Sequence, residues 1–417
     1  MPYLERGQKG FGRALAALFA GGFVTFAILY STQPLLPVLS ADFHVSPAVA
    51  SLSVSLTTAI LAIFMLLTSA WSEDRGRKSI MVASVLASSV LAILTALVPS
   101  FLSLLVLRAV VGATLAGLPA IAMAYVNEEF HPATLGIVMG MYVSGTSVGG
   151  MSGRILVGAM SDLWSWRGAL AGLGVISLAA SILFWRGLPA SRHFTPKPGA
   201  LRRLAPSLAA KLRDPGLLTL YGLGFVLMGG FVTLYNYLGY ELMGPPYHLS
   251  QTWVGLIFLV YLSGTFSSTW MGRLADRHGR VKILWVGLGL SIAGALLTLA
   301  QPLGVKIAAT ALFTSGFFGS HAIASAWVGK RAKTEKAEAS SLYLLFYYAG
   351  SSLAGVTGGF LWTRFGWPGV IGLIVGLLGV GLLLAGGLQH LERLTIAAAQ
   401  GPQGSAGGQP VGAHRGR

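Results

Sequence analysis

The 417-residue sequence contains no cysteine, and charged residues make up only 10% of it. The absence of cysteine excludes disulfides, thiolate catalysis and cysteine-ligated metals. Acidic residues are fewer than basic ones, with 13 Asp and Glu against 29 Lys and Arg. No segment has a phosphate-binding glycine loop, the spacing of a metal site, or a nucleophile paired with a base. These absences argue against an enzyme, a metal centre and a bound cofactor.

Long hydrophobic runs are abundant instead. Hydrophobic residues make up 54% of the chain and its mean hydropathy is +0.70, too apolar for a soluble domain. The runs are about 20 residues long, enough for a helix to cross a ~30 Å hydrocarbon core. Such continuous runs predict an all-α integral membrane protein, because a helix satisfies its own backbone in lipid. Twelve transmembrane helices are expected, at residues 11–31, 48–70, 80–98, 101–126, 134–160, 168–187, 216–240, 252–271, 281–300, 304–329, 339–362 and 368–388.

The net charge of +16 follows membrane topology rather than nucleic-acid binding. If the N-terminus is cytoplasmic and the helices alternate, nearly all Lys and Arg lie on the cytoplasmic side. Only Arg167, Lys306 and Arg364 fall on the opposite side, and Arg108 and Arg154 fall inside helices. This positive-inside pattern predicts that both termini are cytoplasmic and argues against a nucleic-acid partner.

The two halves of the sequence repeat each other. Three pairs of segments match, "HVS" at 44–46 with "HLS" at 248–250, "EDRGRK" at 73–78 with "DRHGRV" at 276–281, and "YVSGTSVGGMSG" at 142–153 with "YYAGSSLAGVTG" at 347–358. Their offsets of 204, 203 and 205 residues are nearly constant, which indicates a duplicated six-helix unit. Such repeats are typical of secondary transporters, whose substrate site lies between the repeats near the bilayer midplane.

The repeat sets the expected domain boundaries. The longest connection, 188–215, is rich in Pro and basic residues, which predicts a cytoplasmic linker. The low-complexity end of the chain is expected to be disordered. We therefore predict a cytoplasmic N-terminus (1–10), a first six-helix bundle (11–187), the linker (188–215), a second six-helix bundle (216–388) and a disordered cytoplasmic tail (389–417).

Several motifs resemble those of a known family. "GRLADRHGR" at 272–280 is similar to the loop between helices 8 and 9 of the major facilitator superfamily, and "SAWSEDRGRK" at 69–78 is a degraded copy of it. "LVLRAVVG" at 105–112 resembles the helix 4 motif of the proton-coupled branches. "GTSVGGMSGR" at 145–154 resembles the helix 5 motif of the antiporter branches. Over residues 11 to about 390 the chain is similar to bacterial drug/proton antiporters of the arabinose-efflux-permease-like subgroup.

The resemblance implies two pseudo-symmetric bundles that rock about a central pocket, and a cytoplasmic gate. In the family, the carboxylates of this loop help to close the cytoplasmic side, a role that falls here on Glu73 and Asp276. Gly279 is expected to permit a tight turn. The alternative is that these charges only set topology and snorkel to the interface. The predicted gate residues are Glu73, Arg77, Lys78, Gly272, Asp276, Arg277, Gly279 and Arg280.

Two arginines fall within predicted helices. A cation at mid-helix costs at least ~2.5 kcal/mol on insertion scales, so Arg108 and Arg154 each need a partner or a water-filled cavity. They could bind an anionic substrate group or repel a proton; the alternative is a structural arginine satisfied by backbone carbonyls and hydroxyls. No carboxylate falls in the core of a predicted helix, which weakens the case for a cationic drug. Close helix packing is predicted at Gly112, Gly145, Gly149 and Gly153.

Other polar groups mark a predicted substrate or proton pathway. His321 is titratable at membrane depth, and the ordinary histidine pKa of about 6.5 suits proton exchange. The alternative is a packing role, which is common for a lone histidine in a helix. Gln33 and Asn236 carry amides that need partners and are expected to line the pocket. Tyr235 and Tyr347 belong to the same set, with an interfacial anchor as the alternative for Tyr235.

These features together predict a secondary transporter that exports a small organic solute or drug in exchange for protons. One alternative is a proton-coupled uptake symporter for an organic anion. Another is a membrane-embedded enzyme or a sensor without transport, which the repeat symmetry and the missing catalytic cluster disfavour. The expected partners are a small-molecule substrate, protons and the lipid bilayer, with no cofactor, no metal and no nucleic acid. The resemblance implies a multi-pass monomer in a bacterial cytoplasmic (inner) membrane.

Overall fold

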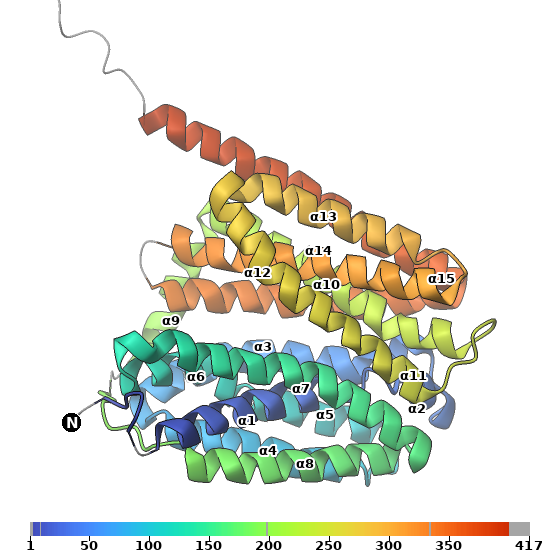
Figure 1. Ribbon diagram of the computed structural model, residues 1–417, viewed down its shortest axis with the longest axis horizontal. Coiled ribbons are helices and arrows are strands. Elements are labelled where there is room, and N and C mark those ends of the chain that lie inside the picture. Colours follow the sequence, from blue (N-terminus) through green and yellow to red (C-terminus); the bar gives the residue numbers. More distant parts are fainter. Residues whose placement is uncertain (1–2, 9, 197–198, 333–334, 400–417) are drawn as a thin grey trace, which may run out of the picture.

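Helices make up nearly all of the computed structural model, which describes residues 3–8, 10–196, 199–332 and 335–399 (Figure 1). The N-terminal bundle contains α1 (Phe11–Leu29), α2 (Leu36–Asp42), α3 (Pro47–Arg75), α4 (Lys78–Thr95), α5 (Phe101–Leu115), α6 (Gly117–Glu129), the 3-10 turn η1 (Pro132–Thr134), α7 (Leu135–Leu163) and α8 (Trp166–Gly187). The C-terminal bundle contains α10 (Pro215–Met243), α11 (Gln251–Leu256), the 3-10 turn η2 (Ile257–Val260), α12 (Tyr261–His278), α13 (Arg280–Leu297), α14 (Leu303–Arg331) and α15 (Lys336–Ala399). A short helix, α9 (Ala200–Leu212), lies in the connection between the bundles.

The helices account for twelve membrane crossings. Ten of the described helices are long and apolar enough to span a bilayer, and they include Phe101–Glu129 and Gln251–His278 as continuous spans. The last of the ten holds two crossings, because Gly366 (φ 62°, ψ −150°) breaks α15 into two helices. α7 is 29 residues long, as α10 is, but its many glycines and serines lower its hydropathy. The prediction of an all-α fold with twelve transmembrane helices is confirmed.

The backbone repeats the internal symmetry of the sequence. His44 and His248 both adopt positive φ angles, 51° and 48°, although neither is glycine. Gly76 and Gly279 end α3 and α12 with φ angles of 94° and 95°, a region that glycine enters freely. Both pairs are separated by the offsets of 203 and 204 residues seen in the sequence. The two bundles therefore have equivalent turns at equivalent places.

The first predicted span, 11–31, agrees with α1 to within two residues, and the segment "STQP" separates α1 from α2; Pro34 has no N–H and disfavours helical geometry at Gln33. The chain departs from the sequence prediction at two places. The linker contains the helix α9, whose sequence is rich in Ala and Leu. The last helix continues to Ala399, so the prediction of a disordered tail is corrected over residues 389–399. Residues 400–417 lie outside the described residues.

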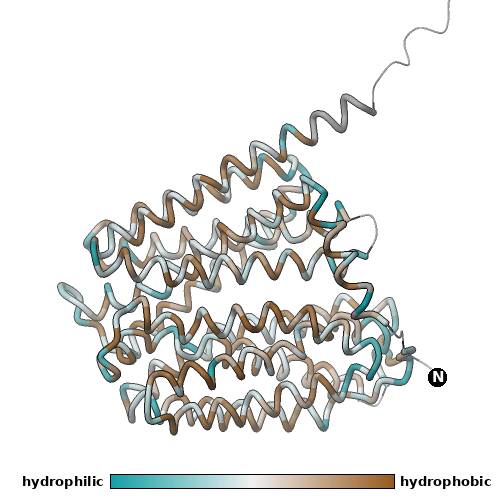
Figure 2. Tube along the Cα trace, turned by 180° about the vertical axis from the view of Figure 1, so that it is seen from behind, coloured by the Kyte–Doolittle hydropathy of each residue, from teal (hydrophilic) through white to brown (hydrophobic). Residues whose placement is uncertain are grey.

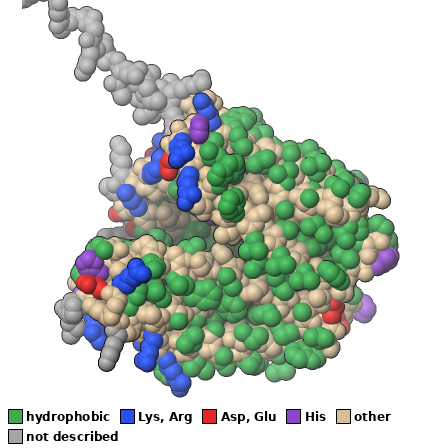
Figure 3. Space-filling model, viewed as in Figure 1, with side chains coloured by type: hydrophobic (Ala, Val, Ile, Leu, Met, Phe, Trp, Pro, Cys, Tyr) green, Lys and Arg blue, Asp and Glu red, His purple; other side chains and the backbone are tan. Residues whose placement is uncertain are grey.

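The two ends of the molecule differ in charge and in shape. Hydrophilic residues concentrate where the helices end (Figure 2). Lys and Arg gather at the end that carries the N-terminus, which we call the basic end, and there the surface is hollowed between the bundles (Figure 3). At the opposite or far end, α2 packs against α10 and α11 packs against α7. The bundles thus meet at the far end and enclose a crevice that opens at the basic end.

Lys306 is a buried cation at the far end. It lies in the first turn of α14, within the predicted span 304–329, and is only 2% exposed. Its Nζ lies 2.6 Å from a carboxylate oxygen of Glu241 on α10, and the rings of Tyr247 and Trp367 flank it. This ion pair joins two helices of the same bundle.

Candidate functional site

The interruption between α1 and α2 is held open by Arg108. Its Nε donates to the carbonyl of Ser53 (2.9 Å), and its two terminal nitrogens donate to the carbonyls of Ile28 (3.1 Å) and Leu29 (2.6 Å). Two of these acceptors belong to the last turn of α1; the Ile28 carbonyl also accepts from Ser31, whereas that of Leu29 has no other described donor. Arg108 is 1% exposed. The geometry therefore favours the structural alternative for this arginine, which caps α1 and positions the turn that carries Gln33.

Arg154 begins a hydrogen-bond relay that crosses from one bundle to the other. Its Nε donates to Oε1 of Gln33 (2.7 Å), and Nε2 of Gln33 donates to Oδ1 of Asn236 (2.8 Å). A guanidinium can only donate hydrogen bonds, so it fixes the orientation of the Gln33 amide and, through it, that of Asn236. Nδ2 of Asn236 is left as the last donor and has no described partner. We call these three residues the central relay.

Aromatic rings surround the guanidinium of Arg154. Its carbon lies 4.3 Å from the ring centre of Tyr30, 4.9 Å from that of Phe258 and 5.3 Å from that of Tyr261. Tyr30 belongs to the N-terminal bundle, whereas Phe258 and Tyr261 belong to the C-terminal bundle. A buried cation over an aromatic face gains about 2 kcal/mol or more. These contacts therefore bind the two bundles together at the depth of the central relay.

A second aromatic cluster lies on the C-terminal bundle around His321. Its Nδ1 is 2.9 Å from the hydroxyl of Tyr343, and its ring is 4.7 Å from that of Tyr347. The described contacts of Tyr235 are with other residues: its hydroxyl bonds Thr314 at 2.6 Å, and its ring stacks on Phe258. His321 and Tyr347 are partly exposed, unlike the residues of the central relay. These two residues are thus the more accessible part of the site.

Hydrogen bonds close the far end. The hydroxyl of Tyr240 donates to the carbonyl of Leu36 (2.9 Å) and lies 2.7 Å from Oγ of Ser40. On the other side of the interface, the carboxylate of Asp162 accepts hydrogen bonds from the backbone N–H of Thr252 (2.8 Å) and from its hydroxyl (2.7 Å). All of these contacts join one bundle to the other. We call them the far-end contacts.

The predicted gate residues at the basic end are bonded within their own bundles. Arg77 forms an ion pair with Glu128 (2.8 Å), and Asp276 forms a longer one with Lys330 (3.5 Å). Among the described residues, no ion pair joins 11–187 directly to 216–391. The remaining gate residues lie in the same two loops: Glu73, Lys78, Gly272, Arg277, Gly279 and Arg280. The loops are therefore not joined by an ion pair while the basic end is open.

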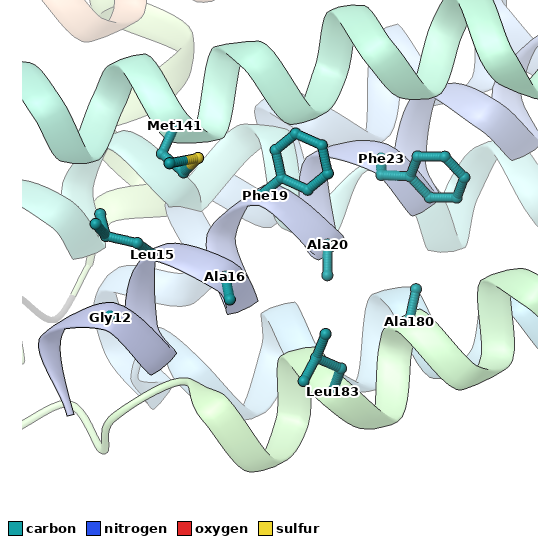
Figure 4. A pocket seen from close by; sticks show the side chains of 9 residues that line it. All are labelled: Gly12, Leu15, Ala16, Phe19, Ala20, Phe23, Met141, Ala180 and Leu183. Carbon is teal, nitrogen blue, oxygen red and sulfur yellow. The ribbon is translucent and has the colours of Figure 1, made fainter.

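Two other features can be set apart from the site. A groove on the outside of the N-terminal bundle, between α1, α7 and α8, is lined by apolar residues such as Phe19, Met141 and Leu183 (Figure 4). It has no side chain that could hold a polar solute. No group of three or more metal-ligating side chains occurs in the described part of the chain. The central relay and the His321 cluster are therefore the candidate site.

Comparison with known proteins identifies the family. A model of the Major Facilitator Superfamily matches residues 18–261 and 234–401. The chain belongs to the major facilitator superfamily. It is 50% identical over 394 residues to the uncharacterized MFS-type transporter YybF of Bacillus subtilis, covering 94% of this chain and 98% of YybF. It is 45% identical over 388 residues to the inner membrane transport protein YnfM of Escherichia coli, covering 93% of each.

A solved structure agrees with the fold. A bacterial homologue of the human lysosomal transporter Spinster superposes with a TM-score of 0.71 at 17% identity, covering 94% of this chain and 98% of that one. As a member of the major facilitator superfamily, the chain is a multi-pass secondary transporter of a small molecule and not an enzyme. The predictions of family, fold and non-enzymatic function are confirmed at this level.

The structure brings together only part of the predicted pathway. Gln33, Arg154 and Asn236 form one chain of hydrogen bonds, and His321 contacts Tyr347. The polar groups of Arg108 and Tyr235 are bonded to other partners, backbone carbonyls and Thr314. The predicted packing glycines lie against other helices, where a Cβ would overlap Thr57, Phe19, Phe23 and Ala27: Gly112, Gly145, Gly149 and Gly153. Sequence reasoning missed several contact residues, namely Ser40, Asp162, Thr252 and Phe258. No local pattern marks these residues, because each is an ordinary polar or aromatic residue whose partner is distant in the sequence.

Proposed function

We propose that this transporter exports a small organic solute across the bacterial inner membrane in exchange for protons. The basic end faces the cytoplasm in this proposal, which agrees with the concentration of Lys and Arg there (Figure 3). The protein works as a single chain. The two bundles rock about the central relay, so that the crevice opens alternately to the two sides.

The observation that carries the proposal is the position of the candidate site between the bundles. The crevice opens at the basic end, and the far-end contacts close it beyond the relay. The rings of Tyr30, Phe258 and Tyr261 come from both bundles, so a solute bound among them would contact both. Such a surface suits a solute with an apolar or aromatic body. Loading from the cytoplasm followed by release at the far end gives export.

The proton carrier in this proposal is His321. Its imidazole lies in the C-terminal bundle, partly exposed, with Tyr343 as a hydrogen-bond partner that can donate or accept. No Asp or Glu among the described residues lies in the interior of a membrane-spanning helix near this cluster. The imidazole is therefore the group best placed to take up a proton when the solute leaves.

Reconstitution tests both parts of the proposal. In proteoliposomes with an imposed pH gradient, a solute library should reveal solute-dependent proton movement, and its complete absence would refute proton-coupled export. His321→Ala should abolish pH-driven exchange and leave solute counterflow intact. His248→Asn, in the loop before α11, is the matched control and should change neither, because asparagine tolerates the positive φ at this position. Unchanged pH-driven exchange in His321→Ala would exclude this residue as the carrier.

One observation favours a second candidate, a proton-coupled uptake symporter for an organic anion. Arg154 is buried without a carboxylate partner among the described ion pairs. The direction of solute movement under a pH gradient that is acid outside distinguishes the two. Export requires movement out of the cytoplasm-equivalent compartment, whereas symport requires movement into it.

The loops at the basic end complete the proposed cycle. When the far end opens, the bundles approach at the basic end, and Glu73 and Asp276 come within reach of the opposite bundle. α9 contacts α3 as well as α10 and α15, so the linker already touches both bundles at this end. In this proposal the two loops close the cytoplasmic side, which assigns them the gate role implied by their motif.

A further inference from the structure

The guanidinium of Arg154 is a buried positive charge that no negative charge balances. The residue is 3% exposed. Its described hydrogen-bond acceptors are the neutral amide of Gln33 and the backbone carbonyl of Gly150, one turn earlier on α7. Taking a charge of this size out of water costs several kcal/mol unless it is paired, and an amide with three ring faces compensates it only in part. The site therefore lacks an anion.

We propose that Arg154 is the anion-binding group of the transport pocket, that it becomes accessible from the far side when the far end opens, and that the transported solute is a small organic carboxylate. This inference rests on the proposed alternating access but not on the direction of transport. The solute class follows from the number of charges. One guanidinium matches one carboxylate in a bidentate pair, whereas a phosphate dianion would need a second cation. Arg108 cannot supply that second charge, because backbone carbonyls hold its side chain.

Opening of the far end changes the surroundings of Arg154. Arg154 stays with α7, whereas Phe258 and Tyr261 move away with the C-terminal bundle. The hydrogen bond between Gln33 and Asn236 crosses the same interface and breaks as well. The guanidinium then loses two of its three ring faces, and its spare N–H groups point into the opened crevice. A carboxylate is the acceptor that restores its bonding.

Unpaired donors on the opposite bundle fit the same solute. Nδ2 of Asn236 and the hydroxyl of Tyr261 are buried and have no hydrogen-bond partner in the described structure. Asn236 is fully buried, so its unmade bond carries a penalty of about 1–3 kcal/mol. Both groups can donate to an acceptor oxygen held near the relay. A carboxylate that displaces Gln33 from Arg154 would also remove the constraint on the Gln33 amide, which links solute binding to the relay between the bundles.

Charge-selective labelling tests the proposal without a known substrate. Because the native chain has no cysteine, Ser40→Cys creates a single thiol at the far end, on α2. The change removes the Ser40–Tyr240 bond from every variant alike, so all rates are compared within this one background. It is labelled from outside with an anionic reagent, sulfonatoethyl methanethiosulfonate, and with its cationic trimethylammonium counterpart, using methyl methanethiosulfonate as the uncharged reference. A unit charge about 10 Å away changes the ratio of the two rates about fourfold even at the dielectric constant of water. Adding Arg154→Gln should therefore lower the anionic-to-cationic ratio about fourfold or more.

Two variants control for charge and folding. Arg154→Lys keeps the charge and should keep the ratio. Arg167→Gln removes a positive charge from the far end of the same bundle, where Arg167 bonds the carbonyls of Ala96 and Val98, and should have a smaller effect than Arg154→Gln. Unaltered labelling by the uncharged reagent shows that each variant is folded.

Protection by a ligand tests the solute class. Benzoate should slow the labelling of Ser40→Cys in the native background and have no effect with Arg154→Gln, and benzamide, its uncharged analogue, should not protect in either. Three results would overturn the proposal: a thiol unreactive to all three reagents, a rate ratio unaffected by Arg154→Gln, or equal protection by benzoate and benzamide. A failure of proton-driven export would leave these labelling results unchanged, so the two proposals can be tested separately.

Discussion

Removing one hydroxyl from the far-end contacts should shift the conformational equilibrium of the whole transporter. In Tyr240→Phe the ring remains, so no cavity forms, but the bonds to the Leu36 carbonyl and to Ser40 are lost. Both bonds join the bundles and exist only while the far end is closed. A neutral hydrogen bond contributes about 0.5–1.5 kcal/mol net, so the closed far end loses about 1–3 kcal/mol. The ratio of far-end-open to far-end-closed molecules should rise about 5- to 150-fold.

Distances between spin labels measure this ratio. Ala133 and Ala337 are exposed residues at the basic end, one on each bundle, and cysteines introduced there are the only thiols of the labelled chain. Double electron–electron resonance should show that Tyr240→Phe increases the population with the shorter distance, because the basic end closes as the far end opens.

The matched control lies on the same helix. Tyr235→Phe also removes one tyrosine hydroxyl from α10, but the bond it loses, to Thr314, lies within the C-terminal bundle. That bond persists in both conformations, so Tyr235→Phe should leave the distance distribution unchanged. An unaltered distribution in Tyr240→Phe, or an equal shift in both variants, would refute the inference that the far-end contacts stabilise the conformation with the far end closed.

Two further predictions concern stability and are checked by thermal unfolding in detergent. Arg108→Met should lower the free energy of unfolding by about 1.5–3 kcal/mol, because it removes the charged donor shared by three carbonyls and leaves that of Leu29 without any other described donor, and a change under about 1 kcal/mol would contradict the capping role. Asp214, outside the membrane at the start of α10, bonds Arg331 and two backbone N–H groups; burial alone would raise its pKa, but these bonds hold the pKa below its ordinary value. Because the pKa is lowered in the folded state, Asp214→Asn should cost about 0.2–1 kcal/mol at every pH above about 4, the range for a partly exposed ion pair, since asparagine keeps the capping bonds. This difference should vanish as the pH falls through the folded pKa, and a cost that grows in acid would show that the sign is wrong.

Much of the architecture could be predicted because it depends on local properties of the chain. The length of a hydrophobic run decides whether it can span lipid, and the distribution of Lys and Arg indicates its orientation, wherever the run finally packs. The repeated turns were equally visible, since Gly76 and Gly279 occupy matching places in matching motifs and both adopt positive φ. The break after α1 was within reach of the sequence as well, because Pro34 follows a run of polar residues.

The roles of the two buried arginines could not be separated in the same way. Arg108 and Arg154 look alike in the sequence, each a single cation in an apolar helix. In the folded chain, Arg108 meets the carbonyl end of α1, whereas Arg154 meets an amide and the rings of the opposite bundle. The difference depends on which neighbouring helix each side chain faces. A hydrophobic run has no property that specifies this neighbour, because lipid and protein are almost equally apolar surroundings for it.

Span number, charge bias and duplication were thus decided along the chain, by lengths and spacings that survive any arrangement of the helices. The relay from Arg154 to Asn236 was decided only when two bundles packed at one angle, because its outer members are 82 residues apart and a displacement of a few ångströms would part them. Hydrogen bonds act over about 3 Å, whereas the hydrophobic effect that orders the spans depends on total area, so the fold can be anticipated from composition and the site requires the packed structure.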